Sequence, residues 1–264
     1  MRSAVRKTGR VTSPVPVSQP AAVDGDPVVR GHQIVKRFGE GATAVEALTG
    51  VGVDFAPRTF TAIMGPSGSG KSTLMHVLAG LDRATSGWVE IDGTRLDGLS
   101  DRELTLLRRE KVGFIFQSYN LLPVLDAREN IVLPLKIGGA EPDPAWLDEL
   151  VDAVGLRDRL GHRPSEMSGG QQQRVAVARA LVSRPSVIFA DEPTGNLDSA
   201  SSREVLGLLR HAVDALGQTI VMVTHDAAAA AVADRLLFLA DGQIVDDRAH
   251  LEVDEILDHL KALR

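Results

Sequence analysis

Apolar and polar residues alternate along the part of the chain that follows residue 27. Segments 28–38 and 45–55 both show this alternation. In the second segment, Val51, Val53 and Phe55 fall on one face. A period of two residues is typical of strands with one buried face and one solvated face. We therefore expect an antiparallel β portion at this end of the chain.

Short apolar runs follow and predict further strands, of which 60–64, 187–190 and 219–223 are expected to be buried. The runs are residues 60–64, 88–91, 111–116, 187–190, 219–223 and 235–239. Segments with helical spacing separate most of these runs, as in a parallel sheet covered by helices. The expected helices are 73–79, 100–109, 146–154, 168–182, 199–216, 227–233 and 251–263. The dipeptides Asp92-Gly93 and Asp241-Gly242 predict tight turns, and the second returns the chain at Ile244-Val245.

The stretch 118–163 interrupts this order of strands and helices. Asp126 and Glu129 have the spacing of a helix N-cap with a capping box. The prolines that we expect to break the following helical run are Pro134, Pro142 and Pro144. We predict a helical subdomain of about residues 118–172, inserted into an α/β core.

The two ends of the chain differ from the rest. Residues 1–27 contain dispersed cations and prolines but no apolar run of the kind a secretory signal needs. Their composition predicts a disordered tail, and a weak electrostatic tether to anionic lipid is the alternative. We assign residues 28–248 to the main domain and 249–264 to a short C-terminal helix.

Composition narrows the class of protein. The chain has 264 residues, of which 44% are hydrophobic and 24% charged, as in ordinary globular domains. Its net charge of −6 favours no nucleic-acid partner. It contains no cysteine, which excludes disulfides and cysteine-based zinc sites. No run approaches the ~20 apolar residues of a transmembrane helix, so we expect any membrane role to act through a partner.

The candidate chemistry centres on a phosphate-loop pattern, Gly-x4-Gly-Lys-Ser/Thr. The pattern lies between the expected 60–64 strand and the 73–79 helix, which is the context it requires. Backbone N–H groups of such a loop bind phosphate oxygens, Lys71 can reach the β- and γ-phosphates, and the Ser72 hydroxyl can bind Mg²⁺. The candidate phosphate-binding residues are Gly65, Pro66, Ser67, Gly68, Ser69, Gly70, Lys71, Ser72 and Thr73.

Three further polar residues follow expected strands at what should be the same edge of the sheet. Asp191 and Glu192 end the 187–190 run, and His225 follows the 219–223 run. Ligands of open α/β sheets bind at the carboxyl ends of strands. Asp191 can bind Mg²⁺ and Glu192 can deprotonate a water. Without the phosphate loop, we would interpret these three residues as structural. With the loop at the same edge of the sheet, we favour a role in the site.

Two other segments are candidates for nucleotide contacts. Ser168-Gly169-Gly170-Gln171 opens an expected helix, whose first N–H groups form a second anion site. Phe38 lies where an aromatic ring could stack on a purine, although a lone aromatic is more often a core or turn residue.

Taken in order, these motifs resemble the ATP-binding subunit of an ABC transporter over about residues 28–248. The motifs that carry the resemblance are the phosphate loop, Gln117, Ser168-Gly169-Gly170-Gln171, Asp191-Glu192, Asn196-Leu197-Asp198 and His225. Two strings, 117–123 and 190–198, are similar to the branch of lipoprotein-release, macrolide-export and cell-division ATPases. The chain departs from the family by having Phe38 where many members carry Tyr and Met167 where Leu is usual.

The resemblance implies an α/β fold, with a P-loop NTPase core, an antiparallel β subdomain and an inserted helical subdomain. It also implies an ATPase that uses ATP and Mg²⁺. Glu192, His225 and Gln117 would be catalytic, with Glu192 as the general base. Ser72, Gln117 and Asp191 would serve the metal.

The resemblance further implies a head-to-tail dimer, with itself or with a paralogue. In that dimer, Ser168 and Gly170 of one chain would face the γ-phosphate that Lys71 of the other holds. An integral-membrane permease subunit would place the chain at the cytoplasmic face of the cell membrane as a peripheral protein.

The implied function is to power export or extraction by a separate permease. The alternative is a permease-like complex that transports nothing and regulates cell division or cell-wall hydrolysis. A soluble ABC ATPase that acts on DNA or ribosomes fits less well, because the chain has one cassette and no cysteine-containing insertion.

Overall fold

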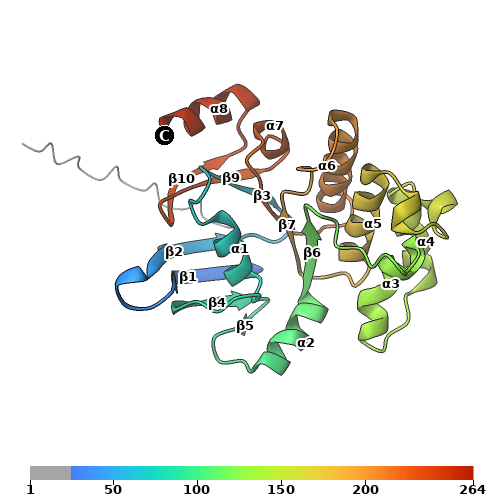
Figure 1. Ribbon diagram of the computed structural model, residues 1–264, viewed down its shortest axis with the longest axis horizontal. Helices are drawn as coiled ribbons and strands as arrows, with labels where there is room; N and C mark the ends of the chain where they lie inside the picture. The colour runs from blue at the N-terminus through green and yellow to red at the C-terminus, as the bar shows by residue number, and fades with distance from the viewer. Residues whose placement is uncertain (1–24, 264) are drawn as a thin grey trace, which may run out of the picture.

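The computed structural model describes residues 25–263, so almost all of the predicted 1–27 tail lies outside the described residues. The described chain forms two sheets with helices around them (Figure 1). None of its helices combines the length and the apolar content that crossing a membrane requires.

The smaller sheet is antiparallel, as the alternating segments predict. Its strands, in the order β2-β1-β4-β5, are β2 (Val45–Phe55), β1 (Val29–Phe38), β4 (Ser86–Ile91) and β5 (Thr94–Arg95). The dipeptide Asp92-Gly93 has positive φ at both residues and joins β4 to β5. These are the angles that a type I′ hairpin turn needs. The short β5 follows from that turn and has no pattern of its own in the sequence.

The larger sheet holds the continuous apolar runs except 88–91, which is part of β4 in the smaller sheet. Its order is β10-β9-β3-β8-β7-β6, and every pair is parallel except β10 with β9. The strands are β3 (Phe60–Met64), β6 (Val112–Phe116), β7 (Val187–Asp191), β8 (Ile220–Val223), β9 (Arg235–Ala240) and β10 (Gln243–Ala249). The expected return at Ile244-Val245 is thus part of a longer strand.

Eight α-helices lie within the described residues. They are α1 (Lys71–Leu78), α2 (Asp101–Lys111), α3 (Ala127–Ile137), α4 (Pro144–Ala153), α5 (Gly169–Leu181), α6 (Ser199–Asp214), α7 (Ala227–Ala230) and α8 (Val253–Ala262). Three 3₁₀ turns accompany them: η1 (Gly41–Thr43), η2 (Arg157–Arg159) and η3 (Pro164–Glu166). The chain from β6 to its neighbour β7 carries α3, α4 and α5 at the far right of the molecule (Figure 1).

The larger sheet separates two buried apolar clusters. On β7, Ile188 and Ala190 face one cluster, whereas Val187 and Phe189 face the other. The first cluster includes side chains of α3 to α8, and the second includes side chains of α1, α2 and the smaller sheet. Both faces of the strand are therefore dry, which explains why its sequence shows no alternation.

Two expectations for the helices were wrong. Pro134 does not break a helix, because it lies inside α3. A proline inside a helix costs about 3 kcal/mol, but the capping box of Asp126 and Glu129 and the burial of Ile131 and Val132 stabilise the preceding turns. The expected 227–233 helix is also shorter, since α7 ends at Ala230 and the next bonds are of the 3₁₀ type.

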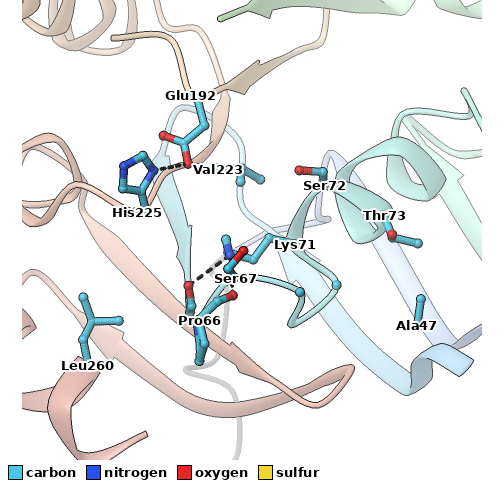
Figure 2. Close-up of a pocket in the computed structure, with 13 residues that line it drawn as sticks. Ala47, Pro66, Ser67, Lys71, Ser72, Thr73, Glu192, Val223, His225 and Leu260 are labelled. Atoms are coloured by element: carbon cyan, nitrogen blue, oxygen red, sulfur yellow. Dashed lines mark hydrogen bonds and ion pairs between the residues drawn. The ribbon is translucent and has the colours of Figure 1, made fainter. Parts of the chain in front are cut away.

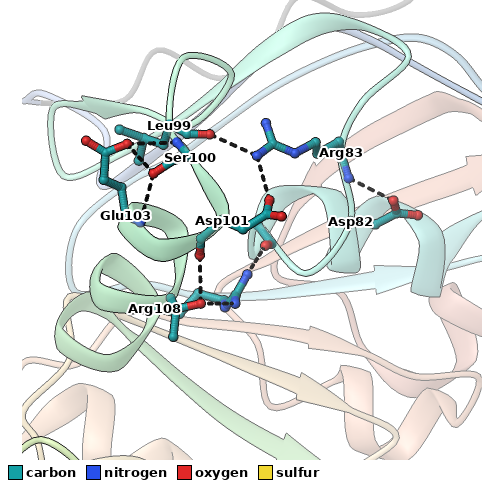
Figure 3. Close-up of polar contacts among 9 residues, drawn as sticks. Asp82, Arg83, Leu99, Ser100, Asp101, Glu103 and Arg108 are labelled. Atoms are coloured by element: carbon teal, nitrogen blue, oxygen red, sulfur yellow. Dashed lines mark hydrogen bonds and ion pairs between the residues drawn. The ribbon is translucent and has the colours of Figure 1, made fainter.

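Contacts at the start of α2 join this helix to the loop that follows α1. Arg83 donates to the Leu99 carbonyl at 2.8 Å and to Asp101 at 2.9 Å (Figure 3). Ser100 and Glu103 form a capping box at the same helix end (Figure 3). These contacts hold the N-terminal end of α2, and β6, which leads to Gln117, follows the other end of the helix.

The two sheets are joined beside the phosphate loop. Gly242, in the turn between β9 and β10, donates its N–H to the Ser69 carbonyl at 3.1 Å. Its own carbonyl accepts from the Thr49 N–H of β2 at 3.0 Å. The buried Arg235–Asp247 pair adds a second link, because Arg235 also donates to the Asp54 carbonyl at 2.6 Å. The smaller sheet therefore has a fixed position relative to the loop.

Candidate functional site

A cavity of about 680 Å³ opens beyond the carboxyl ends of β3, β7 and β8 (Figure 2). This volume is within the range of small-ligand pockets. The residues that line it are Ala47, Gly65, Pro66, Ser67, Gly68, Gly70, Lys71, Ser72, Thr73, Glu192, Val223, His225 and Leu260. Most of the predicted phosphate loop thus forms one wall, and Glu192 and His225 form another.

The phosphate loop can close tightly because of two glycines. Gly65 and Gly70 have φ of 149° and 100°, which L side chains rarely adopt. A Cβ at Gly65 would lie 2.0 Å from the Leu239 carbonyl oxygen, and one at Gly70 would lie 2.5 Å from that of Ala47. Gly70 is also the N-cap of α1, so the helix starts at Lys71, earlier than the sequence pattern predicts. The N-terminus of α1 therefore opens into the loop, where it favours anions.

Lys71 closes the loop on itself. Its Nζ donates to the carbonyl oxygens of Gly65 at 3.0 Å and Pro66 at 2.8 Å (Figure 2). Burial lowers the pKa of Lys71, while the nearby Glu192 and Asp191 carboxylates raise it. A phosphate group in the cavity would supply a stronger, charged acceptor than either carbonyl.

Ser72 and Asp191 bring two oxygen donors together from different elements. Ser72 Oγ lies 3.5 Å from Asp191 Oδ1. Burial raises the pKa of Asp191, and the charge of His76 lowers it. Within the described residues, no group of three His, Asp or Glu side chains could hold a metal alone. The donors fit Mg²⁺, which commonly binds one or two protein oxygens, substrate phosphates and waters.

Glu192 is held by two neighbours at the end of β8. His225 Nδ1 lies 2.7 Å from Glu192 Oε1 (Figure 2), and Thr224 Oγ1 donates to Oε2 at 3.3 Å. The main-chain N–H of Glu192 donates to the Val223 carbonyl at 2.9 Å, and its φ is 47°. The carboxylate is mostly buried. It is therefore oriented beside the cavity, as a base acting on a bound water requires.

Gln117 is not one of the residues that line the cavity. It follows β6 directly, and its side-chain Nε2 donates to Asn196 Oδ1 at 3.1 Å. The main-chain carbonyl of Gln117 accepts from Asn196 Nδ2 at 3.1 Å. The structure therefore pairs Gln117 with the segment Asn196-Leu197-Asp198, a contact that the sequence analysis did not predict.

The Ser168 segment is separate from the cavity in the same chain. Ser168 caps α5, with a capping box to Gln171 whose bonds measure 3.3 and 2.9 Å. A Cβ at Gly169 would lie 2.8 Å from the Tyr119 hydroxyl, and one at Gly170 would lie 2.8 Å from Ser201 Oγ. The two glycines thus allow close packing at the start of α5, while Ser168 itself is exposed.

Phe38 also lies outside the set of lining residues. Its ring is 46% exposed at the end of β1, and Lys36 Nζ lies 4.9 Å from the ring centroid. In this smaller sheet, Ala47 of β2 is the residue that reaches the cavity.

The structure adds residues that the sequence analysis missed. Thr224 binds Glu192, and its place next to His225 in the sequence is a signal that could have identified it. Val223 also lines the cavity, and it directly precedes Thr224 and His225 in the sequence. By contrast, Leu260 reaches the cavity from α8, and no motif connects this helix with the phosphate loop (Figure 2).

Comparison with known proteins gives a consistent result. The family model described as "ABC transporter" matches residues 48–195. The macrolide export ATP-binding/permease protein MacB of Marinobacter nauticus is 48% identical over 223 residues, which is 84% of this chain and 34% of the relative. MacB of Brucella melitensis is 46% identical over 231 residues, which is 87% of this chain and 36% of the relative. The chain thus spans about a third of the length of these relatives.

Solved structures agree with these relatives. The dimeric post-hydrolysis state of the ATP-binding cassette MJ0796, bound to ADP and Pi, is 38% identical, with a TM-score of 0.76 over 84% of this chain and 98% of that one. CbiO1 from Clostridium perfringens, part of an ABC transporter complex, is 24% identical, with a TM-score of 0.76 over 90% and 93%, and shows the fold alone. The predicted α/β fold of an ABC ATPase is confirmed. The chain therefore belongs to the ABC transporter family.

Proposed function

We propose that the chain powers export or extraction by a separate permease, through hydrolysis of Mg·ATP in the 680 Å³ cavity. One observation carries this proposal, namely that Lys71, Ser72, Glu192 and His225 line the same cavity. Together they offer a cation for phosphate, an oxygen for a metal and an oriented base.

Phosphate binding would use contacts that are already preformed. Lys71 would give up its hydrogen bonds to the Gly65 and Pro66 carbonyls and bind the β- and γ-phosphates instead. The N-terminus of α1 would face the negative charge of the same phosphates. The other loop residues contribute backbone N–H groups. Phe38 is the candidate that stacks on adenine.

The metal would be held by Ser72 and Asp191, with Gln117 as a further ligand. When bound, Mg²⁺ neutralises charge on the phosphates that it contacts. The Asp191 carboxylate would also orient the Ser72 hydroxyl for metal binding, because it accepts a hydrogen bond from that hydroxyl.

Glu192 acts as the general base in this proposal. It takes a proton from the water that attacks the γ-phosphate, and its carboxylate is held for that purpose by His225 and Thr224. His225 also contacts the γ-phosphate. The water must lie between Glu192 and the phosphate loop, which face each other across the cavity (Figure 2).

A second chain would complete the site. Ser168 and Gly170 form an anion site outside the chain's own cavity, so they serve the nucleotide held by a partner. The MJ0796 cassette, which is described as dimeric, supports a dimer, and the head-to-tail arrangement is part of the proposal. ATP then holds two cassettes together, and its hydrolysis releases them, because the nucleotide binds the closed state better. The partner is a second copy or a paralogue.

The permease would dock at the groove between α2, β6, α3 and α5. This groove has a volume of about 350 Å³ and contains Arg109, Phe114 and Pro134. Exposed apolar side chains follow Gln117 along the chain, with Val124 73% exposed and Ile137 69% exposed. Surfaces of this kind mark protein contacts. The relatives named ATP-binding/permease proteins support a permease partner. A position at the cytoplasmic face of the cell membrane is part of the same proposal.

We predict that Glu192→Gln retains ATP affinity within about threefold and loses turnover by about 10²–10⁴-fold, because the amide cannot accept a proton. With ATP, this variant should elute as a dimer in size-exclusion chromatography. Glu149→Gln, the same change on the exposed face of α4, is the control. Normal turnover of Glu192→Gln would remove Glu192 from the role of base.

We predict that Asp191→Asn raises the melting temperature of the nucleotide-free chain by a few degrees at pH 7. Burial raises the pKa of Asp191 above its ordinary 3.8, so folding favours the protonated form. The contribution of Asp191 to the stability of the folded chain is fully present below pH 3.8, its ordinary pKa. This contribution is lost as the pH rises through the raised pKa of the folded state. The difference between variant and wild type should shrink towards pH 4, as measured by calorimetry.

The same variant should respond less to Mg·ATP than the wild type does, since Asp191 is a proposed metal residue. A lower melting temperature at pH 7 would contradict this account. It would mean that the contacts of the carboxylate with Ser72, Lys71 and His76 outweigh its burial.

We predict that the Glu192→Gln chain with ATP recovers an integral-membrane permease from solubilised native membranes, and that adding Val124→Asp abolishes recovery. Val45→Asp is the control, because Val45 is also an exposed valine (64%) but belongs to β2 of the smaller sheet and not to the segment that follows Gln117. ATP binding should be unchanged in both. Recovery of division or cell-wall-hydrolase proteins would favour the regulatory alternative, and recovery of only ribosomal or DNA-bound material would overturn the transporter proposal.

A further inference from the structure

Gln117 and Asn196 are joined by two reciprocal hydrogen bonds. Gln117 follows β6, whereas Asn196 lies between β7 and α6, 79 positions along the chain. Gln117 Nε2 donates to Asn196 Oδ1 at 3.1 Å, and Asn196 Nδ2 donates to the Gln117 main-chain carbonyl at 3.1 Å. The two bonds form a closed ring that involves both ends of the Asn196 amide.

This ring dictates which end of each amide points where. A main-chain carbonyl can only accept, so Asn196 must turn its Nδ2 towards it. Asn196 Oδ1 then faces the Gln117 side chain, and because this oxygen can only accept, Gln117 donates to it from Nε2. The oxygen of Gln117, Oε1, is therefore the end of the amide left over for another partner.

The residue before Asn196 is small because Gln117 occupies its side-chain space. A Cβ at Gly195 would lie 2.7 Å from Gln117 Nε2 and 3.0 Å from Cδ. Gly195 is not in the left-handed region, so the restriction is one of space. Its N–H donates to the Glu192 carbonyl at 3.0 Å. The Gln117 amide is thus packed against a turn that starts at the proposed base.

We propose that Asn196 is a positioning residue that fixes the Gln117 amide with its oxygen available to the metal. The inference rests on the proposed function, in which Gln117 serves Mg²⁺. Magnesium accepts only oxygen from an amide, because the NH₂ end carries no lone pair for a cation. Without Asn196, the amide would rotate freely and lose part of its affinity for the metal.

A purely structural role makes a different prediction. If the ring only clamped two loops, losing it would disturb ATP binding and metal binding alike, whether or not Gln117 kept its side chain. If Asn196 acts through the Gln117 amide, its loss should matter only while that amide is present. A double-mutant cycle separates these cases.

The experiment measures binding of Mn²⁺, a paramagnetic stand-in for Mg²⁺, by electron paramagnetic resonance. The chains carry Glu192→Gln and are loaded with ATP. Four chains are compared: Glu192→Gln alone, and Glu192→Gln combined with Asn196→Ala, with Gln117→Ala, or with both. We expect each single change to weaken Mn²⁺ binding about 3–10-fold, and the double change to be no weaker than Gln117→Ala. ATP affinity in EDTA should stay the same throughout.

Two further variants strengthen the test. Gly195→Ala keeps Asn196 but places a Cβ against Gln117 Nε2, so it should weaken Mn²⁺ binding in the same way. It also keeps the inference testable if Asn196→Ala fails to fold. Ser199→Ala, at the first residue of α6, leaves both amides in place and should change nothing.

The outcomes distinguish this inference from the proposed function. Normal Mn²⁺ affinity of Asn196→Ala and Gly195→Ala, beside weakened Gln117→Ala, would overturn the positioning role and leave the function intact. Additive losses in the double variant would also overturn it. Normal affinity of Gln117→Ala would overturn the metal role of Gln117 itself, and with it the inference.

Discussion

The alignment of four parallel strand ends is the constraint on which the site depends. Ile63 of β3 pairs with Val223 of β8, Val223 with Asp191 of β7, and Asp191 with Phe116 of β6. The residues just beyond this row include the phosphate loop, His225, Glu192 and Gln117. Because side chains alternate along a strand, a slip of one residue would move Asp191 to the opposite face of the sheet. The dry packing of both faces therefore protects the chemistry at the edge.

Ionisable side chains whose burial disfavours their charged form also lie at this edge of the sheet. Burial lowers the pKa of Lys71 and raises that of Asp191, so each group is held at some cost in its charged form. In the proposed function, Mg·ATP would bring a cation to Asp191 and phosphates to Lys71. The nucleotide would then supply a counter-charge to each group, and its binding would favour the closed assembly over the open one.

The sequence predicted what local chemistry and periodicity determine. The loop glycines, the strand-end carboxylates and the capping box of Asp126 and Glu129 depend on residues close together in the sequence, so their pattern is visible there. Features that depend on distant packing were missed. Pro134 continues a helix because of burial beyond its own turn, Leu260 reaches the cavity from another helix, and the Gln117–Asn196 pair depends on strand order. The expected nucleotide stacking of Phe38 needs a bound base and stays a prediction.

The most direct test of the account is whether the site is shared between two chains. The natural chain has no cysteine, so single cysteines can report on it cleanly. Glu192→Gln chains carrying either Ser67→Cys or Ser168→Cys would be mixed and treated with a short bismaleimide. The account predicts a covalent dimer of the two chains that requires ATP, because Ser168 of one chain faces the phosphate loop of the other. Absence of this dimer with ATP, or equal yield without ATP, would contradict the account.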